Sequence, residues 1–210
     1  MNKDELQNII SGKSEVKYGA IIQAAASYFK GSEDSSSVAQ DYKQFKKQET
    51  KILEKFITDN DLWVQDINPK NYVSEGAEQR VFLKDGKYVI KLNDAIFYHS
   101  WLDYFNSLIL NNYFFPDTAY KLLGFYLEND VIYAVVRQAF VKATEKTDLS
   151  NVSYFMGENG FLNTKNNDYF NPKLGIILED LHDENVLTEN GILRFIDTVF
   201  FLTEEFYKEN

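Results

Sequence analysis

The chain has 210 residues, a net charge of −10 and no cysteine, with 44% hydrophobic and 16% aromatic residues. The apolar content is enough for a folded core, the charge makes a nucleic-acid partner improbable, and the lack of cysteine excludes disulfides and thiolate metal sites. No apolar run is long enough for a membrane helix and the first residues lack the build of a signal peptide, so we expect no membrane partner and a cytoplasmic location.

The first sixty residues have the spacing of helices. Leu6, Ile9 and Ile10 recur at helical intervals, as apolar residues on one helix face do. A longer helix is predicted over 38–59, with one apolar face and one face rich in Lys, Gln and Glu. No chemistry is visible here, and residues 1–62 are expected to form a helical N-terminal extension or a partner surface.

From Trp63 the pattern changes to strands. An Asp-Gly turn joins two predicted strands at 81–83 and 88–92, which is the signature of a β-hairpin. A helix is predicted over 94–111, with Asp94 as its N-cap. The remaining predicted elements are two strands at 120–127 and 131–137, a short helix at 149–156 that starts near Asp148 or Ser150, and short strands around loops within 173–201.

Three polar residues near the C-terminus carry the main chemical signal. Asp180 and Asn185 lie five residues apart ahead of an apolar strand, and Asp197 ends the next apolar strand. Phosphoryl transfer needs mainly positioning, magnesium and a carboxylate that orients the attacking hydroxyl, and magnesium prefers hard oxygen ligands. The pattern therefore indicates that Asn185 and Asp197 share a metal ion while Asp180 faces an acceptor hydroxyl. A solvated acidic loop followed by a capping aspartate is the alternative.

A lysine and a glycine upstream add to this signal. Lys91 lies inside the apolar strand at 88–92, where a lysine either snorkels from a sheet edge or pairs with an anion. Gly76 lies in the turn before the first strand and would let the backbone approach a phosphate closely. A plain hairpin loop explains this turn equally well.

The order of these features resembles the protein-kinase-like fold. The segment 180–187 reads DLHDENVL and fits every position of the D-L-H-x-x-N-V-L catalytic loop of bacterial and small-molecule-kinase-like members. More narrowly, the chain looks like the kinase-like domain of polyvalent proteins from phages and bacterial mobile elements. The supporting segments are 75–78, 123–125, 135–138, 160–161 and 195–197, and the resemblance covers about residues 63–200.

The resemblance implies an α+β, protein-kinase-like fold. An antiparallel-sheet N-lobe with one helix is expected over 63–137, and a hinge with a minimal, truncated C-lobe over 138–210, after the helical extension at 1–62. The chain ends thirteen residues after Asp197, so we expect no long activation segment and no helices that would hold a protein substrate. Whether the chain is part of a larger polyvalent protein is open.

The resemblance also implies ATP and magnesium as cofactors and an unknown phosphate acceptor. Asp180 matches the catalytic-loop aspartate that orients the acceptor hydroxyl, and Asn185 and Asp197 match the two metal-binding positions. Lys91 matches the catalytic lysine that pairs with the α- and β-phosphates. His182 is expected to support the loop by packing and hydrogen bonding.

Four further residues are implied to contact the nucleotide. Gly76 and Glu78 belong to the turn that enters the first strand. Gln138 and Phe140 belong to the hinge at 138–141, whose backbone would bind adenine.

The chain departs from the family pattern in two places. The predicted helix region 94–112 contains no Glu to pair with Lys91, so Glu78 or Asp103 would take that role, and we favour Glu78 because it lies on a neighbouring strand. After Asp197 the chain continues with Thr198 where the family has a phenylalanine.

Three functions are therefore considered. The first is a minimal kinase-like phosphotransferase, and the alternative is a catalytically inactive kinase-like module that binds a nucleotide or a protein. The third is a metal-dependent hydrolase that uses Asp180, Asp183, Glu184 and Asp197. It is the least favoured, because such sites usually recruit several histidines or bridging carboxylates, and the chain has only 2 histidines.

Overall fold

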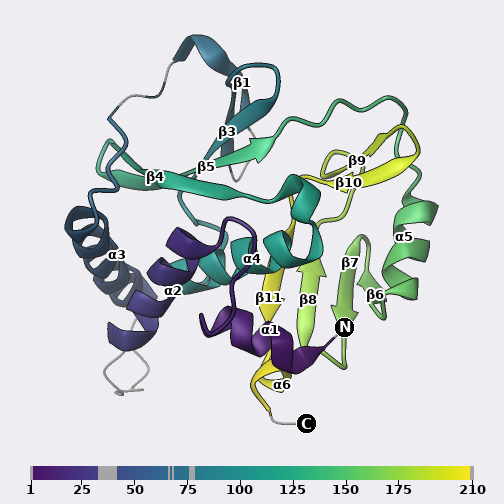
Figure 1. Cartoon of the computed structure of the whole chain (residues 1–210), viewed down its shortest axis with the longest axis horizontal. Coiled ribbons are helices and arrows are strands. Elements are labelled where there is room, and N and C mark those ends of the chain that lie inside the picture. The colour runs from purple at the N-terminus through teal and green to yellow at the C-terminus, as the bar shows by residue number, and fades with distance from the viewer. Residues whose placement is uncertain (1, 33–41, 66, 68, 76–78, 209–210) are drawn as a thin grey trace. The chain divides into compact units, whose positions relative to one another are not determined.

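The structure is a computed structural model that describes residues 2–32, 42–65, 67, 69–75 and 79–208. It divides into two compact units, which are described separately. Figure 1 labels the helices and strands of the chain. Unit 1 comprises Met1–Lys17, Asn106–Ala119 and Val141–Asn210, and unit 2 comprises Tyr18–Phe105 and Tyr120–Phe140. Helices and antiparallel sheets occur in the described part of the chain, as the sequence predicts.

Unit 2 contains a five-stranded antiparallel sheet of order β1-β2-β3-β5-β4. The predicted first hairpin is confirmed, because Asp85 Oδ1 accepts hydrogen bonds from the amides of Lys87 and Tyr88 and Gly86 has a φ of +72°. In sheet order the strands are β1 (Tyr72–Glu75), β2 (Gln79–Leu83), β3 (Tyr88–Asn93), β5 (Val131–Ala139) and β4 (Lys121–Glu128).

A short extended segment, residues 62–64, pairs with the outer edge of β4. Leu62 O accepts from Phe125 N, and Phe125 O accepts from Val64 N, both at 2.8 Å. The contact is made at a bulge between Leu122 and Gly124. Gly124 has a φ of +147°, and a Cβ there would collide with the carbonyl of Leu62, so only glycine fits this close backbone approach.

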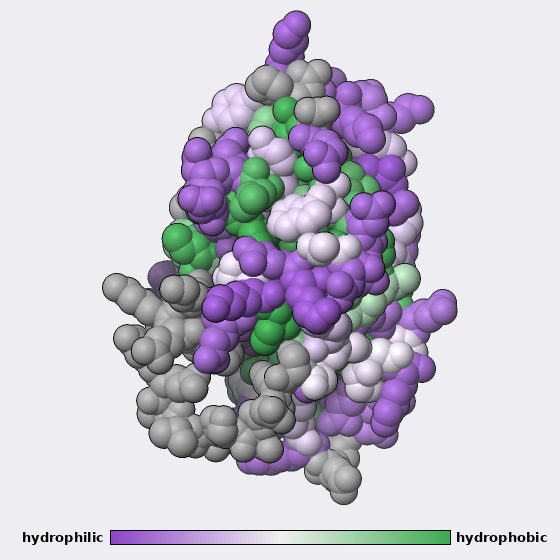
Figure 2. Space-filling view, turned by 90° about the vertical axis from the view of Figure 1, so that its left-hand side faces the viewer, coloured by the Kyte–Doolittle hydropathy of each residue, from purple (hydrophilic) through white to green (hydrophobic). Residues whose placement is uncertain are grey.

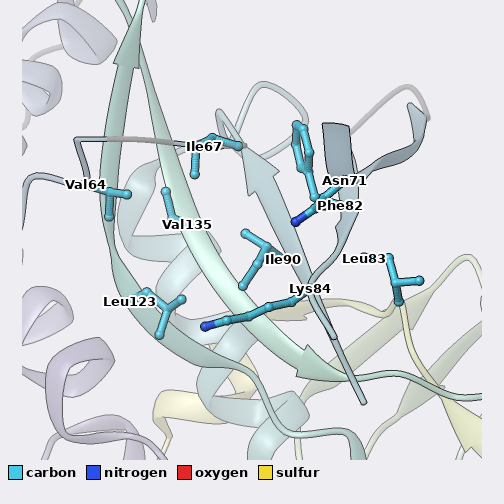
Figure 3. Close-up of a pocket in the computed structure, with 9 residues that line it drawn as sticks. All are labelled: Val64, Ile67, Asn71, Phe82, Leu83, Lys84, Ile90, Leu123 and Val135. Atoms are coloured by element: carbon cyan, nitrogen blue, oxygen red, sulfur yellow. The ribbon is translucent and has the colours of Figure 1, made fainter. Parts of the chain in front are cut away.

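One face of this sheet carries an apolar cluster and a pocket. Phe82, Leu92 and Val135 form the buried centre of the cluster. A pocket of about 210 Å³ opens over the same face (Figure 3) and is lined by Val64, Ile67, Asn71, Phe82, Leu83, Lys84, Ile90, Leu123 and Val135. Because successive side chains of a strand alternate between faces, Lys91 lies on the opposite face from the pocket-lining Ile90.

The helices of unit 2 pack through aromatic side chains. They are α2 (Ala20–Ser32), α3 (Tyr42–Asp59), the 3₁₀ helix η1 (Pro69–Asn71) and the first turn of α4 (Trp101–Phe114). The ring of Phe29 lies 6.0 Å from that of Phe105, and Tyr28 lies 5.3 Å from Phe56. The predicted helix at 38–59 is confirmed from Tyr42 onward, and its first residues lie outside the described part.

The predicted start of the next helix at Asp94 is wrong. Asn93 Oδ1 and Asp94 Oδ1 instead accept from the amides of Ala95 and Ile96, and Ala95 has a φ of +57°. These local turns compete with a helix for the same backbone groups. Helix α4 begins at Trp101, and Ser100 Oγ caps it by accepting from Asp103 N at 2.9 Å.

Unit 1 holds two small antiparallel sheets, of order β11-β8-β7-β6 and β10-β9. The predicted short strands in 173–201 are confirmed, and β6 and β7 are additional. The strands are β6 (Leu162–Lys165), β7 (Asp168–Asn171), β8 (Ile176–Glu179), β9 (Val186–Glu189), β10 (Ile192–Phe195) and β11 (Val199–Leu202).

The helical elements of unit 1 include α1 (Lys3–Ile10), the rest of α4, the 3₁₀ helix η2 (Pro116–Thr118), α5 (Leu149–Glu158) and α6 (Glu204–Tyr207). Asp148, one of the two residues predicted near the start of this helix, is the N-cap of α5, because its side chain accepts from Ser150 N. Hydrogen bonds from Ser150 hold the pKa of Asp148 below its ordinary value. Helix α1 is tied to the C-terminal end of the unit through Lys3 Nζ, which donates to the carbonyls of Glu205 and Lys208.

The surface in Figure 2 mixes hydrophilic and hydrophobic side chains. In the described ranges, no helix is both long and apolar enough to cross a bilayer.

Candidate functional site

The loop after β8 places Asp180 at the surface of unit 1. Asp180 has a φ of +68°, and its N–H donates to Asp168 Oδ1 at 3.0 Å. The next amide, of Leu181, donates to Asn167 O at 3.1 Å. The turn between β6 and β7 therefore supports the backbone of Asp180, while its carboxylate remains exposed to solvent.

Asn185 is bonded to Asp180 through its amide nitrogen. Nδ2 donates to the carbonyl of Asp180 at 2.9 Å and to its Oδ2 at 2.8 Å. With the nitrogen turned toward Asp180, the Oδ1 atom of Asn185 is oriented as the remaining acceptor of the amide. Such an oxygen suits a hard cation.

His182 lies within the same loop. Its Nε2 is 3.3 Å from Asp180 Oδ1, and its Nδ1 accepts from Glu184 N at 3.2 Å. Both ring nitrogens therefore contact groups of the loop itself, as expected of a residue that holds the loop in shape.

Asp197 follows β10 and is joined to the loop through the backbone of Asn185. The carbonyl of Asn185 accepts from the amides of Ile196 at 2.9 Å and Asp197 at 3.4 Å. Unit 1 thus brings Asp180, Asn185 and Asp197 together in one hydrogen-bonded group. Across the described ranges, no three His, Asp or Glu side chains gather as ligands of one metal ion, so the clustered carboxylates of the hydrolase hypothesis receive no support there.

Lys91 lies in the interior of the sheet of unit 2. Strand β3 has neighbours on both sides, with Val81 and Val136 opposite Lys91. The residue is only 4% exposed, and its Nζ lies 5.5 Å from the ring centre of Tyr120. A lysine that snorkels from a sheet edge would be exposed, so that alternative is wrong.

The two hinge candidates lie at the end of β5 in unit 2. Gln138 is 1% exposed and pairs with Val89, while Phe140 is 42% exposed. The amide of Phe140 donates to Lys87 O at 2.8 Å. An adenine contact at Phe140 would therefore use its carbonyl or its ring.

Gly76 and Glu78 lie outside the described residues. The choice between Glu78 and Asp103 as the partner of Lys91 consequently stays open. The nucleotide-binding roles of Gly76, Glu78, Gln138 and Phe140 stay predictions.

Several residues that support the site were missed by sequence reasoning. Asp168 holds the amide of Asp180, and Thr118 donates to the carbonyl of Phe195 just before Asp197. Asn111 accepts from Thr198, the residue after Asp197. Their residue types are common in loops and helices, and no spacing in the sequence singles them out.

One comparison with known proteins identifies a family for the chain. A family model described as Serine/Threonine/Tyrosine Kinase found in polyvalent proteins matches residues 46–204. No curated protein and no solved structure matches the chain. Because the family model spans most of the chain, including the loop with Asp180 and Asn185, the protein belongs to the kinase-like family found in polyvalent proteins.

Proposed function

We propose that the protein is a minimal phosphotransferase that uses ATP and magnesium and acts in the cytoplasm as part of a mobile-element polyvalent system. The observation that carries the proposal is the hydrogen-bonded group in unit 1, in which Asn185 bonds Asp180 through its side chain and Asp197 through its carbonyl. Family membership supplies the reaction class. The phosphate acceptor is a hydroxyl compound whose identity the proposal leaves open.

The residues of unit 1 fit a magnesium ion. Asn185 offers an amide oxygen because its nitrogen is engaged by Asp180, and Asp197 offers a carboxylate on the adjoining backbone. Magnesium is usually held by one or two carboxylates together with phosphate oxygens and water, and bound there it would neutralise phosphate charge. Asp180, with an exposed carboxylate 2.8 Å from Asn185 Nδ2, orients the acceptor hydroxyl and takes its proton.

Unit 2 supplies the nucleotide-binding residues in this proposal. The five-stranded sheet serves as the N-lobe, Lys91 binds the α- and β-phosphates, and the hinge at 138–141 binds adenine. Lys91 is 4% exposed, and the attraction between an ammonium group and a phosphate is stronger in low-dielectric surroundings than in water. Helices α1 and α2, which precede the residues matched by the family model, act as an extension of the kinase-like domain.

One observation favours the inactive alternative. Helix α4 reads WLDYFNSLILNNYF and contains no glutamate, so the usual acidic partner of the kinase lysine is absent from it. A kinase-like module without turnover would tolerate this loss. It would bind a nucleotide or a protein and transfer no phosphate.

The metal and nucleotide roles are tested by isothermal titration calorimetry of ATP into the protein, with and without magnesium. We expect magnesium-dependent binding, and we expect Asp197→Ala to weaken it by at least about tenfold, the loss typical of a disturbed metal site. Asp183→Ala is the matched control, because Asp183 is an exposed carboxylate of the same loop. Absent heat with the wild type, or unchanged binding in Asp197→Ala, contradicts the proposal.

A further inference from the structure

Buried hydroxyl and amide side chains fix the backbone on both sides of Asp197. Before it, Thr118 Oγ1 donates to the carbonyl of Phe195, and after it, Ser107 Oγ accepts from Phe200 N at 3.0 Å. Rings reinforce both ends, since Phe115 stacks on Phe195 at 4.1 Å and Phe114 on Phe200 at 5.4 Å. All of these residues belong to unit 1.

The contact closest to Asp197 is made by the next residue. Thr198 Oγ1 donates to Asn111 Oδ1 at 2.8 Å, and Asn111 Nδ2 lies 3.5 Å from the carbonyl of Thr118. Asn111 is 0% exposed and Thr198 is 4% exposed. Ser107 and Asn111 are four residues apart and so lie on one face of α4. We call Ser107, Asn111, Thr118 and Thr198 the α4 clamp.

We propose that the α4 clamp is a set of positioning residues that holds Asp197 in one metal-binding conformation, with the Asn111–Thr198 hydrogen bond as its central link. The inference rests on the proposed metal-binding role of Asp197. Its physical basis is burial: a hydroxyl or amide cut off from water strongly disfavours rotation away from its protein partners. The backbone of Asp197 is thereby held between two anchored neighbours and the carbonyl of Asn185.

Thr198 is the residue directly after Asp197, and its hydroxyl gives α4 a polar link to the segment of Asp197. Partners of this kind, which orient a metal ligand without touching the metal, typically change metal affinity or activity 10- to 100-fold when they are removed.

The test compares two substitutions of Thr198 with one control. Thr198→Val keeps the shape but removes the hydroxyl, and Thr198→Ser keeps the hydroxyl. Thr188→Val is the control, because Thr188 is also a buried threonine of unit 1, 8% exposed, and its hydroxyl bonds Thr147 Oγ1 at 3.0 Å. The readout is the affinity for Mn²⁺, measured by electron paramagnetic resonance with the full chain loaded with a non-hydrolysable ATP analogue.

We expect Thr198→Val to weaken Mn²⁺ binding about 10- to 100-fold, whereas Thr198→Ser and Thr188→Val stay within about twofold of the wild type. Equal Mn²⁺ affinity in the wild type and Thr198→Val would overturn the inference. An equal loss of Mn²⁺ affinity in Thr188→Val would also overturn the inference. It would show that removing the hydroxyl of any buried threonine in unit 1 weakens Mn²⁺ binding.

A double variant separates positioning from general destabilisation. In Asn111→Leu/Thr198→Val both partners of the central hydrogen bond become apolar, so neither is left buried and unpaired, and stability should recover in part; the carbonyl of Thr118 still loses its contact with Asn111 Nδ2. We expect thermal stability to return toward that of the wild type while Mn²⁺ affinity stays low. Recovery of both quantities would overturn the inference.

Amide hydrogen exchange distinguishes failure of the inference from failure of the proposed function. The amides of Ile196 and Asp197 donate to Asn185, and we expect faster exchange at both in Thr198→Val, without any ligand. Faster exchange combined with no Mn²⁺ binding by the wild type would reject the proposed metal role of Asp197. Unchanged exchange combined with normal wild-type binding would reject the clamp alone.

Discussion

The left-handed backbone of Asp180, with a φ of +68°, is uncommon for a residue other than glycine, although aspartate adopts it more readily than most. Two contacts hold it: its N–H donates to Asp168 Oδ1, and its carbonyl accepts from Asn185 Nδ2. Sparsely populated conformations of this kind persist only where the surroundings enforce them, and they concentrate at functional sites. Asp168 therefore helps to orient the carboxylate of Asp180.

Removing the side chain of Asp168 should lower the rate of phosphate transfer more than it weakens ATP binding. We expect Asp168→Ala to lower kcat of phosphate transfer about tenfold, the effect of one lost hydrogen bond of about 1.4 kcal/mol, while KM for ATP stays within about twofold. Steady-state kinetics on the full chain measures both constants. A change in KM with kcat intact would show that Asp168 supports nucleotide binding instead.

The sequence singled out Asp180, Asn185 and Asp197 as candidates, which the structure brings into one hydrogen-bonded group, but it did not single out the residues that hold them. The spacing of the three candidates is visible because the proposed chemistry would need these types at these intervals. Asp168 and Thr118 act through single hydrogen bonds across the fold. Any acceptor or donor at the same place would serve, so their positions carry no pattern that a single sequence reveals.

The attachment of the 62–64 segment to β4 depends on one glycine. Gly124 combines a φ of +147° with a position at which an added Cβ would collide with the carbonyl of Leu62. We expect Gly124→Ala to lower the free energy of unfolding by about 1–3 kcal/mol, the cost of a strained backbone conformation. Urea denaturation followed by circular dichroism measures the change.

Gly157→Ala provides the comparison for this substitution. Gly157 lies in α5, and an added Cβ there meets no atom within 4 Å. Alanine in a helix interior is favoured over glycine by roughly 0.5–1 kcal/mol; because Gly157 is the penultimate residue of α5, we expect at most this gain and no loss of stability. Equal stabilities of Gly124→Ala and the wild type would contradict the close approach of the two backbones.

Strands and hairpins were predictable where the turn chemistry is explicit. The Asp-Gly turn gave the β2–β3 hairpin, and Asp148 marked the start of α5. The start of α4 was misplaced because Asn93 and Asp94 form local turns with the amides that follow. Strands β6 and β7 were missed in the sequence. Their connection is rich in asparagine, and β6 is exposed along its whole length. Strand β6 therefore shows neither the apolar–polar alternation nor the apolar run by which a strand is recognised.

The two units divide the proposed chemistry between them. Unit 2 carries Lys91 in the interior of its sheet, and unit 1 carries the loop of Asp180 and the anchored Asp197. The family match at 46–204 includes all of these residues. The net charge of −10 is the reason why the proposal does not take a nucleic acid as the phosphate acceptor, because like charges repel.

Transfer of the γ-phosphate is the most direct test of the central claim. The full chain is incubated with magnesium and ATP labelled at the γ-phosphate, and label is followed into the protein itself, generic protein substrates and small hydroxyl compounds. We predict transfer by the wild type and by Asp183→Ala, and a loss of at least about 100-fold in Asp180→Ala, which removes the acceptor-orienting carboxylate. Magnesium-dependent ATP binding without transfer to any acceptor, or transfer that persists in Asp180→Ala, would contradict the assignment of Asp180 as the catalytic residue of an active kinase.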